Sequence, residues 1–201
     1  MPKEDPAGPA FWEKRYREQY MPWDAGRIPD LARAFISTLA PRSRVLIPGC
    51  GTAHDARAFA EAGHDVIAVD FSAAALDAAR AVLGPYAHCL RLGDFFTMGL
   101  GPPFDVVYER AFLCALPRPA WPRYAPRAAE VLRPGGALAG FFYGDDSERG
   151  PPFGLKSGEL EALLGPSFHQ SVDAAVTDSI PIFQGKERWQ VWLRNPGYRP
   201  A

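Results

Sequence analysis

A glycine-rich turn between an apolar strand and a helix is the first feature of this sequence that could bind a ligand. It lies in the segment VLIPGCGTAHD, residues 45–55. Gly49 and Gly51 lack a Cβ, so the backbone N–H groups of the turn can approach a ligand closely. In the dinucleotide-binding motif G-x-G-x-x-G, the last position is glycine, and here it is His54. The turn is therefore either a degraded dinucleotide loop or a loop for a cofactor without a pyrophosphate.

Acidic residues follow three further apolar runs, each at the point where the run stops. Asp70 comes 19 residues after Gly51, about the spacing at which a carboxylate accepts hydrogen bonds from ribose hydroxyls. Asp94, in the segment LGDFF, could accept from an adenine amino group while Phe95 packs on the ring, or it could be an ordinary turn aspartate. Glu109 ends the next run. Loop and aspartates together suggest an adenosine with ribose hydroxyls, and no GxxxxGK[ST] motif calls for a triphosphate.

The elements that must position these residues alternate between buried strand patterns and helix patterns, which is typical of a parallel sheet covered on both faces. We expect strands at residues 44–47, 65–70, 87–92, 104–109 and 137–143. We expect helices at residues 30–39, 53–62, 73–83, 119–132 and 157–164. Two strand-like runs, residues 169–177 and 187–194, are close enough in sequence to form an antiparallel pair. The prediction is an α/β fold, a doubly wound mixed sheet of about seven strands that ends in an antiparallel hairpin.

The chain has the length and pattern of one domain, residues 1–201. Within it we expect an N-terminal aromatic lid and covering helix at 1–40, a cofactor-binding core at 41–143, and a substrate-side loop, helix and C-terminal hairpin at 144–201. Trp12 and Trp23 belong to a charged N-terminal segment with little core of its own, so they either form a lid over a pocket or simply pack.

Composition excludes several functional classes. Lys and Arg number 22 and Asp and Glu 23, so no basic excess points to a nucleic-acid partner. Cys50, Cys89 and Cys114 have no CxxC spacing, which predicts a reducing compartment and neither a disulfide scaffold nor a metal site. The first 20 residues lack the apolar centre of a signal peptide, and no run reaches the ~18 apolar residues of a membrane span. We expect a cytoplasmic protein that does not bind membranes.

These segments together resemble the class I S-adenosylmethionine-dependent methyltransferases. Within that class the sequence is similar to the thiopurine S-methyltransferase family, which includes the plant halide/thiol methyltransferases. The resemblance covers nearly the whole chain and is carried by FWEKRY, MPWDAGRIPDL, VLIPGCGTAHD, GHDVIAVDFS, GDFF, FDVVYERAFLCALP, LRPGG and GPPF. Several of these segments occur in methyltransferases generally, whereas PWD-x-G, PGCG, the turn after Glu109 and GPPF in this order are specific to the family.

The resemblance implies roles for individual residues. The cofactor-binding set it implies is Trp12, Trp23, Gly49, Gly51, Asp70, Phe71, Asp94, Phe95 and Glu109. Arg110 would hold the anionic acceptor, unless it forms only a structural ion pair with Glu109 or another acid. The implied acceptor pocket consists of Tyr16, Tyr143 and Phe153. Tyr16 departs from the family pattern, since a second tryptophan is common at that position. At Arg110 the plant halide enzymes tend to have tyrosine, whereas thiopurine-type members have arginine, which favours an anionic thiol or thiolate over a simple halide as acceptor.

The expected activity is methyl transfer from S-adenosylmethionine to a small soft nucleophile, with S-adenosylhomocysteine as product. A thiol or thiolate is the expected acceptor, and halide, thiocyanate, selenium and tellurium species are alternatives. We assign no general base, although His54 could bind a ligand, act as a base or only support the loop. From other classes, an NAD-dependent oxidoreductase and a non-catalytic S-adenosylmethionine-binding module stay open. The expected partner is a small molecule, and the expected state is a monomer.

Overall fold

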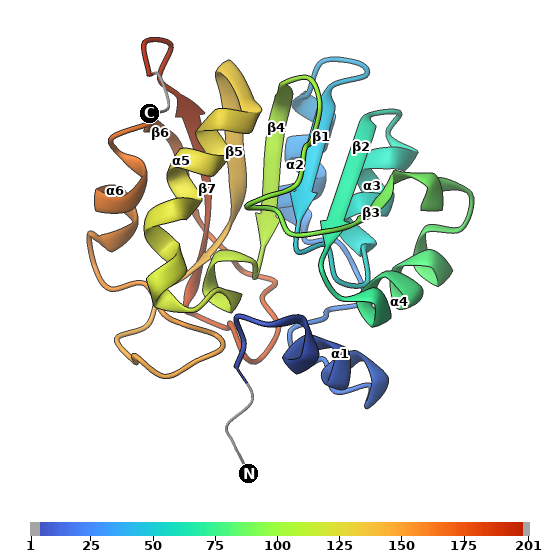
Figure 1. Cartoon of the computed structure of the whole chain (residues 1–201). Coiled ribbons are helices and arrows are strands. Elements are labelled where there is room, and N and C mark those ends of the chain that lie inside the picture. Colours follow the sequence, from blue (N-terminus) through green and yellow to red (C-terminus); the bar gives the residue numbers. More distant parts are fainter. Residues whose placement is uncertain (1–4, 199–201) are drawn as a thin grey trace.

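The computed structural model describes residues 5–198 and contains a seven-stranded sheet in the order β3-β2-β1-β4-β5-β7-β6 (Figure 1). Neighbours from β3 to β5 are parallel, whereas β7 runs antiparallel to both β5 and β6. This arrangement confirms the predicted doubly wound mixed sheet with its antiparallel hairpin. The strands are β1 (Arg44–Pro48), β2 (Asp65–Asp70), β3 (Leu90–Leu92), β4 (Phe104–Arg110), β5 (Leu132–Tyr143), β6 (Phe168–Ala175) and β7 (Glu187–Arg194).

Helices cover both faces of the sheet, because the central strands are apolar on both sides. The α-helices are α1 (Pro9–Arg17), α2 (Asp30–Thr38), α3 (His54–Glu61), α4 (Ala73–Leu83), α5 (Trp121–Val131) and α6 (Glu159–Leu164). The short 3₁₀ helices are η1 (Gly84–Cys89), η2 (Leu113–Ala115) and η3 (Arg118–Ala120). Residues of α2, α3 and α4 join the core on one face, and residues of α5 and α6 join the core on the other.

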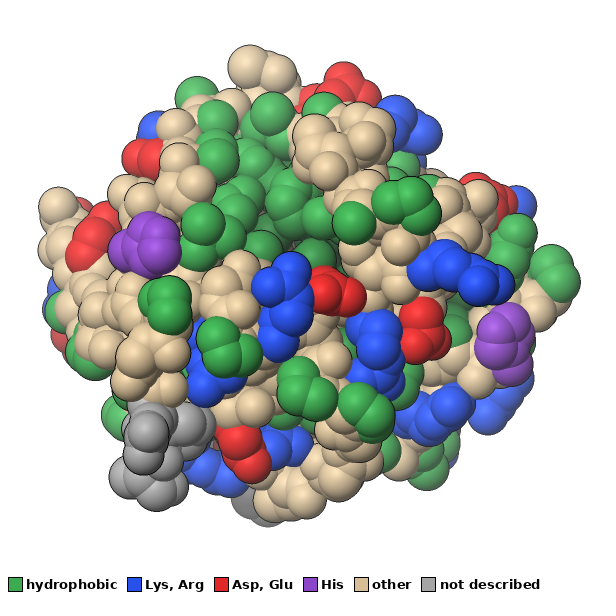
Figure 2. All heavy atoms as spheres, turned by 90° about the horizontal axis from the view of Figure 1, so that it is seen from above, with side chains coloured by type: hydrophobic (Ala, Val, Ile, Leu, Met, Phe, Trp, Pro, Cys, Tyr) green, Lys and Arg blue, Asp and Glu red, His purple; other side chains and the backbone are tan. Residues whose placement is uncertain are grey.

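The sheet reverses its strand order between β1 and β4, since β2 and β3 lie on one side of β1 and β5 lies beyond β4. In open α/β sheets this reversal creates a crevice at the carboxyl ends of the strands, where ligands bind. Helix α1 lies at that end of the sheet (Figure 1). Figure 2 views the opposite end, where acidic and basic side chains are interspersed.

Local sequence signals explain the boundaries of α4. The Ser72 hydroxyl accepts a hydrogen bond from the Ala75 N–H at 3.1 Å, as an N-cap does. Gly84 ends the helix with a φ of 54°, which a residue with a side chain rarely adopts. The predicted helix at 73–83 is confirmed.

Two predicted boundaries were wrong. The third strand covers only 90–92 instead of 87–92, because η1 occupies the residues before it. Helix α5 ends at Val131, and the segment RPGG that was expected to separate helix from strand lies inside β5. The pairing between β4 and β5 shifts there, from Phe104 opposite Leu132 to Val106 opposite Ala137, so the extra residues form a bulge.

The N-terminal 40 residues were predicted to be an aromatic lid and a covering helix. Residues 1–4 of that segment lie outside the described residues. The remainder forms α1, an irregular stretch and α2. Among residues 5–198, no helix has both the length and the apolar character needed to cross a bilayer.

Candidate active site

A cavity of about 450 Å³ lies between the carboxyl ends of β1, β2 and β4 and helix α1, whose residues Trp12 and Tyr16 line it. Its wall has two parts with different construction. The glycine side consists of Gly49, Gly51, Asp70, Phe71 and Asp94. The arginine side consists of Asp24, His54, Asp55, Arg110 and Phe183.

The glycine turn brings backbone into contact with aromatic rings. Gly49 and Gly51 have φ values of 59° and 54°, so the turn needs a left-handed backbone at both positions. A Cβ built on Gly49 would collide with the ring of Phe112. A Cβ built on Gly51 would lie 2.7 Å from the Tyr16 hydroxyl oxygen. The two glycines therefore keep open a narrow space between the turn and the rings above it.

Asp70 holds this turn and faces the same cavity. One carboxylate oxygen accepts from the Gly51 N–H at 3.1 Å, and the other accepts from the Ser72 N–H at 2.9 Å. Burial raises the pKa of Asp70 to about 6, against the opposite effect of these backbone donors. Each carboxylate oxygen has a second lone pair, so the side chain can still accept from two hydroxyl donors in the cavity.

Asp94 is held by a local turn and also lines the cavity. It is a turn aspartate, since its carboxylate accepts from the Phe96 N–H at 2.9 Å and from the Thr97 hydroxyl at 3.4 Å. It also lines the cavity beside Phe95. The Phe95 ring is buried and packs edge-on against Phe112 at 5.5 Å between centroids. A flat ring between Asp94 and Phe95 would meet one acceptor and one apolar surface.

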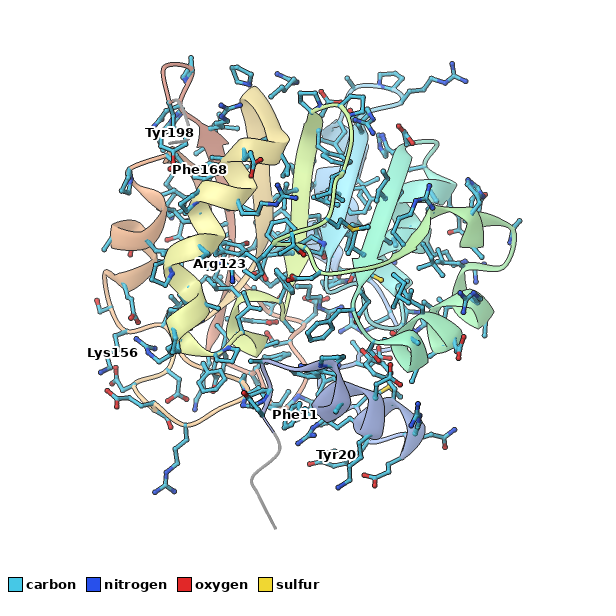
Figure 3. The ribbon with its side chains drawn as sticks, in the orientation of Figure 1. Phe11, Tyr20, Arg123, Lys156, Phe168 and Tyr198 are labelled. Carbon is cyan, nitrogen blue, oxygen red and sulfur yellow. The ribbon has the colours of Figure 1, made fainter. Side chains whose placement is uncertain are left out.

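The aromatic residues of the N-terminal segment cover the cavity. Trp12 and Trp23 line it and pack edge-on with their centroids 5.4 Å apart. Tyr16 lines it too and contacts Trp23 at 6.2 Å between centroids. Phe11 on α1 is buried and Tyr20 after it is exposed, and both are labelled in Figure 3. The segment thus packs within itself and also forms a wall of the cavity.

The lid is attached to the core by a charged side chain. Glu13 on α1 accepts from the Ser72 hydroxyl at 3.1 Å and from the Ala74 N–H at 3.2 Å. These groups belong to the first turn of α4, where a helix has free N–H donors and favours negative charge. Burial tends to raise the pKa of Glu13, but these hydrogen bonds outweigh it and the pKa is lowered. Glu13 therefore fixes α1 next to Asp70.

Arg110 reaches the cavity from the end of β4. Its Nη1 donates to the Arg27 carbonyl oxygen at 3.0 Å and lies 3.8 Å from the Asp55 carboxylate. The side chains of Arg110 and Asp55 are 11% and 16% exposed, so water screens the pair only partly. The ion pair that the sequence left open therefore exists, but its acid is Asp55 and not Glu109. The Tyr108 hydroxyl also donates to Asp55, at 3.2 Å.

Three predicted site residues, Glu109, Tyr143 and Phe153, do not line the cavity. Glu109 is 1% exposed, and its Oε2 accepts from the Phe112 and Leu113 N–H groups at 3.0 and 2.9 Å. Its carboxylate thus binds the backbone of the turn after β4. Burial raises the pKa of Glu109 to about 7. The direct cofactor contact predicted for Glu109 has no support in this geometry.

Tyr143 and Phe153 do not line the cavity, because their side chains pack against other residues. The Tyr143 hydroxyl donates to Asp145 at 2.9 Å, and its ring packs against Phe183, which lines the cavity in its place. Phe153 packs its ring on the core, while Pro151 and Pro152 of the same GPPF segment line the cavity. In the structure, the residues of this segment that line the cavity are thus Pro151 and Pro152 and not the predicted Phe153.

Sequence reasoning missed several lining residues altogether. Asp24 and Asp55 stand in segments that were singled out, PWD and GTAHD, yet neither was assigned a role. Phe112 lies in the turn after β4, and its close contact with Gly49 could only be found in three dimensions. Phe183 precedes β7 in a stretch without any motif. Within residues 5–198, no group of three or more His, Cys, Asp and Glu side chains is placed to hold a metal ion.

Comparisons with known proteins agree with this geometry. The Burkholderia thailandensis 1,6-didemethyltoxoflavin-N1-methyltransferase, crystallised with S-adenosylhomocysteine, has a TM-score of 0.76. It is 19% identical and the alignment covers 97% of this chain and 92% of that one, so the likeness supports the Rossmann-like methyltransferase fold.

Curated relatives are closer in sequence. Thiocyanate methyltransferase 1 of Arabidopsis thaliana is 32% identical over 190 residues, covering 91% of this chain and 84% of that protein. Thiopurine S-methyltransferase of Shewanella putrefaciens is 30% identical over 213 residues, covering 94% and 97%. The family model for thiopurine S-methyltransferase matches residues 7–195. With a match over nearly its whole length, this chain belongs to the thiopurine S-methyltransferase family, whose members are S-adenosylmethionine-dependent enzymes.

Proposed function

We propose that this protein transfers the methyl group of S-adenosylmethionine to the sulfur of a small thiol or thiolate. The observation that carries the proposal is the single cavity that unites the glycine turn, Asp70 and Arg110 at the switch point of the sheet. When bound there, the cofactor supplies an electrophilic methyl group on a sulfonium. A soft sulfur nucleophile can attack such a methyl directly, so the protein need not supply a nucleophile of its own.

The glycine side suits the cofactor. Gly49 and Gly51 line the cavity where the methionyl part would lie, and a Cβ at either position would displace Phe112 or Tyr16, which also line it. Asp70 would accept from the ribose hydroxyls with the lone pairs that its backbone donors leave free. Asp94 would accept from the adenine amino group, and Phe95 would pack on the ring. Phe71 and the two lid residues Trp12 and Trp23 would exclude water from above.

The arginine side suits the acceptor. Arg110 would hold an anionic sulfur, or lower the pKa of a thiol, through its fixed positive charge. Tyr16 and Phe183 would restrict the acceptor to one approach towards the methyl group. Alignment of acceptor, methyl and leaving sulfur in a dry pocket can lower the barrier by about 7–11 kcal/mol. The protein's main task would be this alignment.

A panel of acceptors tests the proposal. The protein is incubated with S-adenosylmethionine and an alkanethiol, thiophenol, iodide or thiocyanate in turn, and S-adenosylhomocysteine and the methylated product are measured. Thiol-dependent formation of both products in equal amounts supports the proposal. Cofactor binding without turnover of any acceptor would favour a non-catalytic binding module, and stabilisation by NADH instead of S-adenosylmethionine would favour an oxidoreductase.

Thiocyanate is the second candidate acceptor. Two relatives that are 32% identical to this chain, from Arabidopsis thaliana and Brassica oleracea, are named thiocyanate methyltransferases. The same panel decides between the two, because a thiocyanate enzyme would have the higher kcat/KM for thiocyanate than for any thiol tested. We also infer that the protein acts as a single-domain monomer in the cytoplasm, which gel filtration and localisation of a tagged protein can check.

A further inference from the structure

His54 is an ionisable residue of the cavity that the proposed function leaves without a role. It is the first residue of α3, directly after the glycine turn, and it lines the cavity. Its Nε2 lies 4.0 Å from Oδ1 of Asp24, and its side chain is 29% exposed. Asp24 is itself held in place, since its Oδ2 accepts from the Thr52 hydroxyl at 2.8 Å. The lid segment thus places a carboxylate beside a histidine inside the cavity.

This pair has the features of an oriented base. A carboxylate next to one ring nitrogen stabilises the imidazolium and leaves the other nitrogen to take a proton. A distance of 4.0 Å is longer than a hydrogen bond, but such contacts tighten when a ligand closes the site. Asp24 directly follows Trp23, which lines the cavity, so a movement of this segment on ligand binding would change the distance between Asp24 and His54.

The charge around Arg110 argues against a cavity built only for permanent anions. Its guanidinium already faces the Asp55 carboxylate at 3.8 Å and the Arg27 carbonyl at 3.0 Å. The buried carboxyl of Glu187 also interacts with it. Part of the positive charge is therefore compensated before any acceptor arrives. A neutral acceptor that becomes anionic only at the moment of reaction loses less hydration on entering such a site.

Much of the rest of the cavity wall is apolar. Residues from three loops that are distant in sequence contribute to it: Cys114, Leu116, Pro151, Pro152, Ile182 and Phe183. Such a surface can cover a hydrocarbon group, whereas a hydrated halide gains nothing from it.

We propose that the acceptor is a neutral thiol with an apolar substituent, and that His54, oriented by Asp24, takes its proton. The proposal rests on the methyl transfer proposed above. The S–H bond breaks and its proton moves to an imidazole nitrogen of His54. The sulfur electron pair forms a bond to the methyl carbon, and the bond from that carbon to the sulfonium sulfur breaks with its electrons staying on that sulfur. The products are a methyl thioether, S-adenosylhomocysteine and an imidazolium that returns its proton to water.

The ionisable groups around His54 and its neighbour Asp55 come from three elements. Asp24 lies in the stretch after α1 next to His54, Asp55 follows His54 on α3, and Arg110 and Tyr108, which contact Asp55, come from β4. Asp55 is already engaged by Arg110 and by the Tyr108 hydroxyl, which leaves Asp24 as the carboxylate that orients the ring.

The test compares acceptors that need a base with acceptors that do not. In His54→Gln, we expect kcat/KM for an alkanethiol at pH 7 to fall about 10- to 100-fold, because an alkanethiol is almost entirely protonated at that pH. Thiophenol, a more acidic thiol that is mostly ionised at the same pH, and iodide arrive as anions. The loss with the alkanethiol should exceed the loss with either of them by at least about tenfold. His88→Gln, an exposed histidine outside the cavity wall, is the matched control.

The pH dependence of kcat/KM is a second measurement, and it would not change if His54 had only a structural role. In the wild type, kcat/KM for the alkanethiol should rise as His54 loses its proton. In His54→Gln the rise should move to higher pH, towards ionisation of the thiol itself at about 8.5 or above. Asp24→Asn should give an intermediate loss in kcat with the same KM, as expected of a positioning residue.

The outcomes separate this inference from the proposed function. Cofactor affinity of each variant is measured by calorimetry. A thiol-selective loss with unchanged affinity and a shifted profile supports the base. An equal loss with all acceptors, a loss of cofactor affinity, or no loss at all would overturn it and leave thiol methylation standing. Absence of thiol turnover in the wild type would instead remove the proposed function.

Discussion

The two sides of the cavity are built in different ways. The glycine side comes from β1, β2, β3 and the turns after them. Its polar side chains bind backbone N–H groups: Asp70 binds those of Gly51 and Ser72, and Asp94 binds that of Phe96. On the arginine side, charged side chains face one another, with Arg110 next to Asp55 and His54 next to Asp24. The first side is fixed by local backbone, and the second depends on mutual compensation of charges. We therefore expect substitutions on the two sides to impair stability and cofactor binding for different reasons.

The largest effect should follow removal of Arg110. Arg110→Ala leaves Asp55 and Glu187 without their cation, and breaking such a buried pair costs about 3–5 kcal/mol of unfolding free energy. Urea denaturation measures this loss. Arg188→Ala removes an exposed partner of Asp173 and should cost less than about 1 kcal/mol.

A double variant checks the cause of that loss. Combining Arg110→Ala with Asp55→Asn should recover part of the stability, because no unpaired carboxylate is then buried at that position. If the two losses simply add, the charges on the arginine side do not compensate one another and the contrast between the two sides is wrong.

The next largest effect should come from the glycine turn. Gly49→Ala places a side chain at a φ of 59° and against the Phe112 ring, so we expect a loss of about 1–3 kcal/mol in stability. The affinity for S-adenosylmethionine should fall by at least about tenfold, because the ring must move into the cavity. Gly101 has a φ of 78°, but no atom lies within 4 Å of a Cβ built on it. Gly101→Ala is therefore a control that introduces backbone strain without a collision, and it should leave the affinity for S-adenosylmethionine unchanged.

Acid should weaken cofactor binding through Asp70. The pKa of this carboxyl is raised to about 6 by burial, and ribose hydroxyls donate best to its ionised form. Below pH 6 the proton competes with the cofactor, so the Kd should rise up to about tenfold for each pH unit. Calorimetric titrations from pH 5 to pH 8 measure the slope. An Asp70→Asn protein that keeps the same slope would exclude Asp70 as its origin.

The smallest effect on binding should come from Glu109, although it ends a strand as Asp70 does. Glu109→Gln keeps an oxygen for the Phe112 and Leu113 N–H groups, so the cofactor affinity should change by less than about threefold. A larger change would mean that the residue acts on the cavity surface after all.

Glu109 should instead affect how the free energy of unfolding depends on pH. Its pKa is raised from 4.5 to about 7, so the folded protein binds this proton more tightly than the unfolded chain. The resulting stabilisation is complete below pH 4.5 and is lost as the pH rises through 7. In Glu109→Gln, the fall in unfolding free energy between pH 5 and pH 8 should therefore be smaller than in the wild type.

The same contrast explains what could be predicted from the sequence. The sheet, α4 with its Ser72 cap and the glycine side follow from short segments, in which apolar runs, glycines and acids stand close together in the chain. The cofactor class and the family followed from those segments. Where local patterns were ambiguous, as at η1 and the bulge in β5, the boundaries were wrong.

The arginine side could be predicted only in part. Arg110 was found at a strand end, but its partner Asp55 lies 55 residues earlier in the chain and is brought near by the packing of α3 on the sheet. Whether Phe153 or its neighbour Pro152 faces a cavity depends on how one loop turns, and no spacing rule decides that. Glu109 and Asp70 have the same place in the pattern, yet only Asp70 reaches the surface of the cavity.

The most direct test of the account is a calorimetric titration of the protein with S-adenosylmethionine and S-adenosylhomocysteine. The account predicts one site with micromolar or tighter Kd for both, and a loss of at least about 30-fold in Asp70→Ala, which lacks two charge-assisted hydrogen bonds. Thermal melting confirms that this variant is folded. No binding of either compound by the wild type, or equal binding by folded Asp70→Ala, would contradict the assignment of the glycine side to the cofactor.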